Sequence, residues 1–385
     1  MTSLFRFRWS PRLRAGLCFV LVWAAAVSSR AASAASEPTF PGKEWERVRT
    51  ADLGAYGWDE KKLAATRIHI RDHANTTGLV VVDRGRVVFT YGDIEERSYL
   101  ASARKSVLAM LYGRWVKNGT INLDATLAEI GIDDLGGLLP AEKKARVRDL
   151  ITARSGVYHP ASNSGDDLAS APPRGSQAPG TYMLYSNWDF NAAGAVFETL
   201  TKRNIYDELE EQLARPLGFQ DWDRAAQRKT GDLNVSRFPA YHMWLSTRDM
   251  ARLGLLMLNE GNWAGTAVLE REWAREIVRA VTPLTEMNPA RRRQGYSGYG
   301  YMWWVWDGPA AIGLFRGAYT ARGAIGQWIT VLPAAQLVIA HKTNSVYERT
   351  TNTESYERML ELLLGARGLK PEGDWPWQRA SAEAR

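Results

Sequence analysis

The pattern of apolar and polar residues predicts β-strands near both ends of the chain. Two short β-branched runs, 79–82 and 86–91, are separated by Asp83-Arg84-Gly85, and this arrangement is typical of a β-hairpin. Apolar runs separated by Gly, Pro and Asp predict four more strands in the C-terminal part of the chain. These strands cover 299–306, 312–319, 327–332 and 337–341.

Helical periodicity predicts three well-marked helices. The first follows Asp59, which can cap its first turn, and the second begins near Ser102. The third follows Ser246-Thr247, either of which can act as its cap. Residues from about 120 to 235 are predicted to be mainly helical, with long loops. Strands at both ends of the chain and a helical insertion between them predict an α+β fold, in which helices flank an antiparallel sheet.

The N-terminus has the three parts of a secretory signal peptide. A start with four arginines precedes an apolar run over 15–27, and small residues follow over 31–36. We therefore predict a signal peptide over 1–35, cleaved near Ala34 or Ala35, and a periplasmic or secreted protein with no stable membrane anchor after cleavage. The alternative is an uncleaved anchor, but the apolar run is shorter than the ~20 residues that a membrane-spanning helix needs.

Composition and charge narrow the class of protein further. Of 385 residues, 45% are hydrophobic and 24% charged, which is ordinary for a globular protein. Loss of five leader arginines would lower the formal net charge from +7 to about +2, so charge does not favour a nucleic-acid partner. The one cysteine, Cys18, lies in the predicted leader, and no disulfide is expected. The oligomeric state stays open.

The first candidate for chemistry is Ser102-Ala103-Arg104-Lys105. Residues three apart lie on one face of a helix, so Lys105 is expected one turn above Ser102. A serine hydroxyl becomes a good nucleophile only when a neighbouring group takes its proton. Burial or a second cation can lower the pKa of a lysine from its ordinary value of about 10.4 far enough for that task. The alternative is a solvated Ser and Lys on an amphipathic helix.

Two further segments carry weaker signals. Tyr185-Ser186-Asn187 offers a tyrosine that can act as a base beside a cation, and an amide that can both donate and accept a hydrogen bond. The segment Gly323-Ala324-Ile325-Gly326-Gln327 leads into a predicted strand. Its glycines would let a substrate approach the strand edge, where backbone N–H groups can form an oxyanion hole. A glycine-rich hairpin turn is an equally good interpretation of that segment.

Together the three segments resemble the serine β-lactamase and penicillin-binding-protein family, above all its class C, esterase and 6-aminohexanoate-oligomer hydrolase branches. Three other segments are also similar to family sequences, and the resemblance covers about residues 45 to 365. They are 149–156, 215–219 and 244–254. The resemblance implies a β-lactamase/transpeptidase-like hydrolase domain over 40–368, followed by a polar tail over 369–385.

The resemblance also implies a role for each site residue. Ser102 would attack the carbonyl carbon and carry the acyl group, while Lys105 and Tyr185 would share the proton transfers. Asn187 would hold the substrate or orient Lys105. The N–H of Ser102 and one near Ile325 would bind the oxyanion, and Gly323, Gly326 and Gln327 would line the substrate site. The family's reaction needs no metal ion and no organic cofactor.

Two departures bear on the substrate. The third segment lacks the Lys-Thr-Gly that helps penicillin-recognising members to bind a substrate carboxylate, although Arg322 is close enough in sequence to offer a charge. Tyr-Ser-Asn also replaces the Ser-Asp-Asn of class A enzymes. The expected substrate is therefore a small ester or linear amide, ahead of a cell-wall peptide and then a β-lactam. A D,D-peptidase, a true β-lactamase and a non-catalytic sensor of cell-wall fragments are the alternatives.

Other conspicuous residues have structural interpretations. His69 and His73 have the spacing of a zinc helix but lack the accompanying glutamate, so a solvated helix face is expected. Lys342-Thr343-Asn344 is interpreted as a strand end, and Arg291-Arg292-Arg293 as a solvated loop. The aromatic residues between 299 and 306 are expected mainly in the core.

Overall fold

The structure is a computed structural model that describes residues 39–378. The predicted signal peptide and Cys18 lie outside the described residues. Within residues 39–378, no helix is both long and apolar enough to cross a membrane.

Its centre is a seven-stranded sheet in the order β2-β1-β13-β12-β11-β10-β9, with every neighbouring pair antiparallel. The strands are β1 (Gly78–Asp83), β2 (Arg86–Gly92), β9 (Ser297–Tyr299), β10 (Trp304–Trp306), β11 (Tyr319–Gly323), β12 (Gln327–Leu332) and β13 (Leu337–Lys342). The first two come from the N-terminal part of the chain and the other five from the C-terminal part, and the two sets meet where β1 pairs with β13. The predicted antiparallel α+β fold is confirmed.

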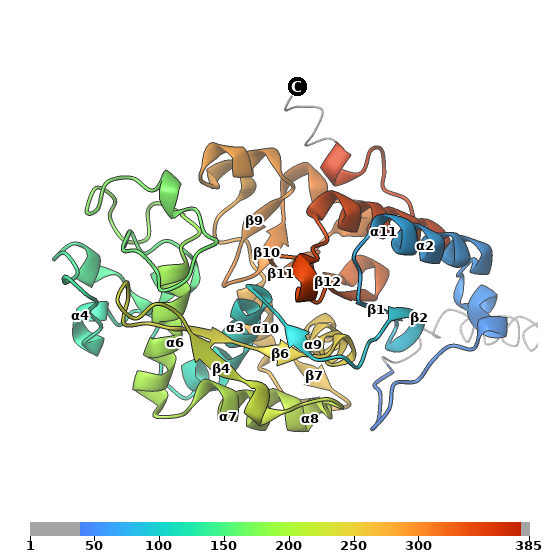
Figure 1. The fold of residues 1–385 in the computed structure, drawn as a ribbon, viewed down its shortest axis with the longest axis horizontal. Helices are drawn as coiled ribbons and strands as arrows, with labels where there is room; N and C mark the ends of the chain where they lie inside the picture. The colour runs from blue at the N-terminus through green and yellow to red at the C-terminus, as the bar shows by residue number, and fades with distance from the viewer. Residues whose placement is uncertain (1–38, 379–385) are drawn as a thin grey trace, which may run out of the picture. The chain divides into compact units, whose positions relative to one another are not determined.

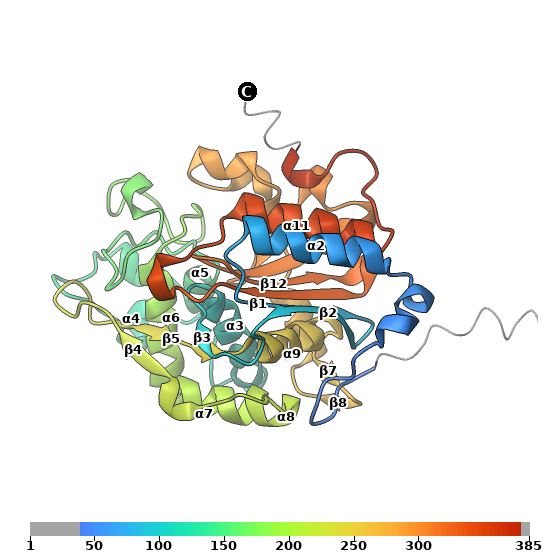
Figure 2. The ribbon, with the colours of Figure 1, turned by 45° about the vertical axis from the view of Figure 1, so that its right-hand side comes forward.

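Helices cover both faces of this sheet. On one face lie α2 (Glu60–His73) and α11 (Thr353–Ala366), side by side in Figures 1 and 2. On the other lie α3 (Ala103–Lys117) and α9 (Thr247–Leu258). Successive residues of β1 alternate between the two cores: Leu79 packs in the cluster beneath α2 and α11, whereas Val80 packs in the cluster that contains α3 and α9. Burial on both faces explains why the strand is a continuous apolar run.

Most of the remaining helices lie between α3 and α9 in the chain and pack beside them. They are α4 (Leu127–Ile130), α5 (Val147–Ile151), α6 (Asn187–Thr201), α7 (Ile205–Leu209) and α8 (Arg215–Leu217), while α10 (Arg271–Ile277) follows α9 and packs on α3. Three two-stranded pairs join β3 (Ser98–Tyr99) to β6 (Trp244–Leu245), β4 (Arg228–Thr230) to β5 (Ala240–His242), and β7 (Asn262–Trp263) to β8 (Thr266–Ala267). The helical insertion therefore brings α6 against α3, and this contact builds the candidate site.

The sequence located most of these elements correctly. Asp59 caps α2 by accepting a hydrogen bond from the N–H of Lys62 at 3.1 Å, and Ser246 caps α9 by accepting one from the N–H of Asp249 at 3.2 Å. The predicted hairpin forms β1 and β2, and the strands predicted over 327–332 and 337–341 form β12 and β13. In each case the local signal and the tertiary environment agree.

Two predicted strands were wrong. The run over 299–306 is a hairpin, in which the chain reverses between Tyr299 and Trp304 and the N–H of Gly300 donates to the carbonyl of Trp303. The run over 312–319 contains a 3₁₀ turn, and β11 begins only at Tyr319. Gly313 and Gly317 have φ values of +50° and +72°, which end an extended conformation. Apolar periodicity alone does not reveal such reversals.

The start of the predicted polar tail packs on the domain. Trp375 and Trp377 stack on each other and contact Phe315, and the indole N–H of Trp377 donates to Glu361 at 2.8 Å. These contacts extend the folded region beyond residue 368, because the two indoles cover the edge of the cluster beneath α2 and α11.

Candidate active site

Ser102 lies at the N-terminal end of α3, where the chain turns sharply from β3. Ala101 directly before it has a φ of +48°, a left-handed conformation that is strained for an alanine and is common at active sites. Ser102 is the N-cap of α3, but its side chain caps no backbone N–H. The hydroxyl is therefore available for chemistry, at a helix end whose unpaired N–H groups favour negative charge.

Lys105 stands one turn along α3 and is 1% exposed. Its amine lies within hydrogen-bonding distance of three side chains: Ser102 Oγ at 2.9 Å, Tyr185 OH at 2.6 Å and Asn187 Oδ1 at 2.7 Å. The structure thus brings together four residues that the sequence singled out, although Tyr185 and Asn187 are 80 or more positions away from Lys105.

Asn187 is the first residue of α6, and its surroundings fix the direction of its amide. Its Nδ2 donates to the carbonyl of Ser164 at 2.8 Å, while its backbone N–H donates to Asp166 Oδ2 at 2.9 Å. The amide oxygen therefore faces Lys105 as an acceptor. Of the two roles implied for Asn187, the geometry favours the orientation of Lys105, since Asn187 does not line the cavity.

Burial shifts the pKa values of Lys105 and Tyr185 in opposite directions. Burial, and next to it the charge of Arg104, place the pKa of Lys105 well below its ordinary value, with Asp166 acting in the opposite direction. Burial raises the pKa of Tyr185, although Ser102 and nearby arginines oppose that effect. Both shifts favour the uncharged forms, an amine with a free lone pair and a phenol, so Lys105 is the better base.

The hydrogen-bonding count also fits a neutral amine. A neutral lysine has two N–H donors and one lone pair. One N–H is used by Asn187 Oδ1, which can only accept. The remaining N–H and the lone pair match the two hydroxyls, Ser102 and Tyr185, each of which can donate or accept. The lone pair can therefore receive the Ser102 proton.

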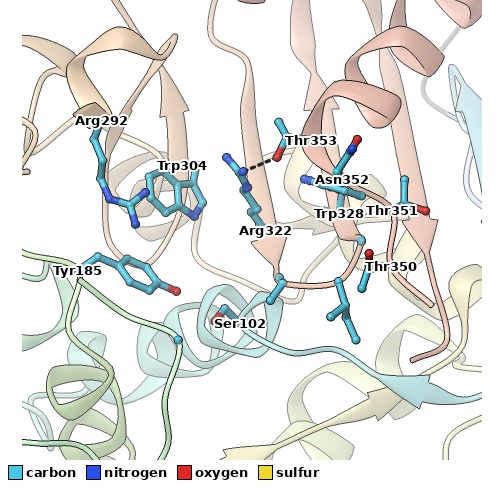
Figure 3. A pocket seen from close by; sticks show the side chains of 15 residues that line it. Ser102, Tyr185, Arg292, Trp304, Arg322, Trp328, Thr350, Thr351, Asn352 and Thr353 are labelled. Carbon is cyan, nitrogen blue, oxygen red and sulfur yellow. Dashed lines mark hydrogen bonds between the residues drawn. The ribbon is translucent and has the colours of Figure 1, made fainter. Parts of the chain in front are cut away.

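Ser102 opens into a cavity of about 440 Å³ (Figure 3). Tyr185, Arg292 and Trp304 lie on one side of it, and the segment Thr350–Thr353 lies on the other. Arg322 comes from the strand between and donates to Thr353 Oγ1 at 2.5 Å. In the part of the chain that the structure describes, the lining includes two arginines and no acidic residue.

Most residues of the segment 323–327 line the cavity, but its glycines are required by packing. Gly323, Ile325 and Gly326 line the cavity, and packing leaves no room for a side chain at either glycine. A Cβ on Gly323 would lie 2.4 Å from the carbonyl oxygen of Leu100, and one on Gly326 would lie 2.6 Å from Thr343 Oγ1. Gly323 is thus required for β11 to approach the chain just before Ser102, rather than for the approach of a substrate.

Gln327 was wrongly assigned to the substrate site. Its side chain is fully buried, donates to the carbonyl of Thr343 at 2.7 Å and does not line the cavity. Gln327 begins β12, and its side chain ties that strand to the end of β13. Sequence alone could not assign the direction of this side chain, because alternation along a strand does not fix which face is the cleft.

The interpretation of Arg291-Arg292-Arg293 as a solvated loop was also wrong in part. Arg291 and Arg292 both bind the buried carboxylate of Asp167 at 2.5 Å, and Arg292 lines the cavity. Its guanidinium lies 5.1 Å from the ring centre of Trp304. Sequence reasoning missed this residue because its partner Asp167 is more than 120 positions away.

Two structural interpretations agree with the structure. Lys342 ends β13 and is buried, where it donates to the carbonyls of Ser98, at 3.0 Å, and Leu245. The aromatic residues of 299–306 are all buried, although Trp304 also forms a wall of the cavity.

Comparison with known proteins places this geometry in context. The family described as beta-lactamase matches residues 64–364. Among solved structures, a proposed beta-lactamase from Bacteroides dorei is 16% identical, with a TM-score of 0.59 and coverage of 81% of this chain and 99% of that one. A proposed 6-aminohexanoate-dimer hydrolase from Bacillus anthracis is 19% identical, with a TM-score of 0.57 and coverage of 78% and 82%.

A third similar structure is EstCE1, a hydrolase with promiscuous acyltransferase activity. It is 16% identical, with a TM-score of 0.55 and coverage of 80% of this chain and 97% of that one. At these identities the solved structures support the fold alone.

The packing of Gly323 gives a test of how the site is built. Gly323→Ala should lower the free energy of unfolding by about 1–3 kcal/mol, because the new methyl group overlaps the Leu100 carbonyl. Urea denaturation measures the change. Gly365→Ala is the control: a Cβ there meets nothing within 4 Å and helix propensity favours it, so that variant should be as stable as the parent or more stable. Equal stability of the two variants would contradict this account.

Proposed function

The chain belongs to the beta-lactamase family, and we propose that, as a serine hydrolase of this superfamily, it cleaves an ester or amide bond through an acyl-enzyme on Ser102. The family resemblance inferred from the sequence is confirmed. The observation that carries the proposal is the set of hydrogen bonds around Lys105, which joins the amine to Ser102, Tyr185 and Asn187 beside an open cavity.

In the proposed first half-reaction, the lone pair of Lys105 takes the Ser102 proton as the serine oxygen attacks the carbonyl carbon. The oxyanion that forms is bound by the N–H of Ser102 and by one near Ile325. As the tetrahedral intermediate collapses, the bond to the leaving group breaks. Lys105 returns the proton to the leaving alcohol or amine, directly or through the Tyr185 hydroxyl, and the acyl group stays on Ser102.

In the second half-reaction, water takes the place of the serine. Lys105 accepts a proton from the water, directly or through the Tyr185 hydroxyl, as the water oxygen attacks the acyl carbon. Collapse of the second intermediate releases the acid, and the proton returns to Ser102 Oγ. No step draws on a group beyond the substrate, water and these side chains.

The cavity wall supports a preference for acidic substrates. Arg292 and Arg322 lie on either side of Trp304, with guanidinium carbons 5.1 and 5.9 Å from its ring centre, and Asp167 balances only part of the charge because it binds Arg291 as well. An ester or amide with a carboxylate can bind these guanidiniums by charge-assisted hydrogen bonds. The absence of Lys-Thr-Gly therefore does not leave the cavity without a cation.

We also propose that the protein is exported, from its basic start, short apolar run and small-residue exit. Expression of the full chain in a Gram-negative host should give a periplasmic protein that begins after Ala34 or Ala35, as measured by intact mass. A chain that keeps residues 1–35 in the membrane fraction would instead support an uncleaved anchor.

Reaction with a fluorophosphonate probe tests the nucleophile. The probe should label Ser102 in the folded protein, and Ser102→Ala should abolish both labelling and ester hydrolysis. The melting temperature should change little, because the Ser102 side chain caps no backbone group.

Ser155→Ala is the control variant for this experiment. Ser155 donates to buried Asp189 at 2.6 Å, forms no hydrogen bond with Lys105 and does not line the cavity, so its loss should cost stability and leave labelling intact. A parent protein that binds substrate slowly without labelling or product release would contradict the proposal and favour the sensor alternative.

Two p-nitrophenyl esters, one acidic and one neutral, test the preference for an acidic substrate. The mono-p-nitrophenyl ester of glutaric acid should have a higher kcat/KM than neutral p-nitrophenyl butyrate. Arg322→Gln should reduce that advantage about tenfold, the scale of one charge-assisted hydrogen bond. Arg316→Gln, at an exposed position that does not line the cavity, should leave it unchanged. A neutral ester that reacts as fast as the acidic one would contradict the preference.

A further inference from the structure

Arg104, which lies between Ser102 and Lys105 in the sequence, is a buried cation. It is 1% exposed and is one of the largest fully buried side chains among the described residues. One Nη donates to the carbonyl of Ala101 at 3.4 Å, the other donates to Asn191 Oδ1 at 3.2 Å, and its Nε has no partner. The guanidinium carbon lies 4.8 Å from the ring centre of Tyr241. Within residues 39–378, Arg104 forms no ion pair with a carboxylate.

Such an arrangement is costly for stability. A buried charge without a paired opposite charge keeps much of its desolvation penalty, which amounts to several kcal/mol per ion. Two long hydrogen bonds to neutral oxygens and one aromatic face offset only part of that penalty. The presence of Arg104 therefore calls for an explanation other than stability.

The hydrogen bonds of Arg104 lead toward Lys105 through three asparagines. Asn191 accepts from Arg104 and donates through Nδ2 to Asn163 Oδ1 at 2.8 Å. The carbonyl of Asn163 lies 3.4 Å from Nδ2 of Asn187, whose Oδ1 accepts from Lys105. Every hydrogen-bonding partner along this path is neutral, so the path fixes the positions of the Arg104 guanidinium and the Lys105 amine without neutralising the charge of Arg104.

Of the charged groups near Lys105, Arg104 has the largest effect on the pKa of its amine. Asp166, on the loop before α6, acts in the opposite direction, but its carboxylate is held by the backbone N–H groups of Asn187 and Leu168. Arg292, from the 3₁₀ helix Ala290–Gln294, reinforces Arg104 with a smaller effect.

The remaining titratable neighbours of Lys105 are neutral. Tyr185 has a raised pKa and stays a phenol. His242, on β5, has its pKa lowered to about 4, first by burial and then by the charges of Arg104 and Arg228, so its ring is neutral at pH 7. Arg104 is therefore the charge that most opposes a proton on Lys105.

We propose that Arg104 is a positioning residue: its buried charge keeps the Lys105 amine free of a proton, ready to accept the proton of Ser102. This inference rests on the proposed function, in which Ser102 is acylated. A neutral lysine is the active form, so activity is present above the pKa of Lys105 and is lost as the pH falls through it. Removal of the neighbouring cation raises that pKa and moves the loss of activity to higher pH.

The experiment follows the rate of fluorophosphonate labelling of Ser102 against pH, counted per folded protein. Arg104→Met and Arg104→Gln remove the charge. In each variant the acidic limb of the pH–rate profile, where labelling falls with falling pH, should move to higher pH by about one unit or more. Labelling at pH 7 should become about tenfold slower if that limb lies near neutrality, and the rate should recover at high pH. Arg104→Lys keeps a cation and should keep the limb close to that of the parent.

Asn191→Asp provides a second route that leaves Arg104 in place. The new carboxylate would pair with the guanidinium and reduce its effect, so the acidic limb should again move up. The variant is close to isosteric, which keeps the test available if the Arg104 variants do not fold.

Arg252→Met is the matched control. Arg252, on α9, is equally buried, has an Nε without a partner, donates to the carbonyls of Leu217, Gly42 and Lys43, and is not among the charges that shift the pKa of Lys105. The loss of Arg252 should change the melting temperature and leave the acidic limb of the pH–rate profile unchanged.

The outcomes separate the two proposals. A parent protein that is labelled at no pH would refute the proposed function itself. A labelled parent whose acidic limb stays fixed in Asn191→Asp and in the folded charge-removing variants would overturn only the role of Arg104. An equal shift in Arg104→Lys and Arg104→Gln would also overturn it, because shape rather than charge would then be responsible.

Discussion

The site depends on a lysine amine that is buried without a carboxylate partner of its own. Water would keep Lys105 protonated, and an ion pair would do the same. Burial beside Arg104, with hydrogen bonds to Ser102, Tyr185 and Asn187 and to no other residue within 39–378, removes both effects. The amine can then accept a proton from a serine held 2.9 Å away, and this constraint accounts for the neutral amides and phenol that surround it.

The fold meets that constraint by bringing three distant parts of the chain together. α3 carries Ser102 and Lys105 and packs on β11, where only a glycine at 323 leaves room for the carbonyl of Leu100. The helical insertion supplies α6, whose first residue is Asn187. The C-terminal strands and the loop at 290–294 supply the aromatic and arginine wall of the cavity. Because β1 pairs with β13, the two ends of the chain form a single support for these elements.

The sequence could identify much of the fold and the centre of the site. Hydrophobic runs located β1, β2, β12 and β13, and cap residues located the starts of α2 and α9, because these signals lie within a few neighbouring residues. Ser102 and Lys105 are one helical turn apart, so their contact also follows from local geometry. The resemblance to a family then connected Tyr185 and Asn187 to them.

By itself, then, the sequence determined most of the helices and strands and the contact of Ser102 with Lys105, since both depend on short-range spacing. Only the tertiary structure decided that 299–306 reverses into a hairpin, that Gln327 points away from the cavity, and that Arg292 reaches it through Asp167. It also decided the environment of Arg104, whose partners lie on the preceding loop and on α6. The partners Asn191 of Arg104 and Asp167 of Arg292 lie 87 and 125 positions away in the chain. The reversal at 299–306 and the direction of Gln327 depend on the strands packed around them, so no local pattern of residue types encodes these properties.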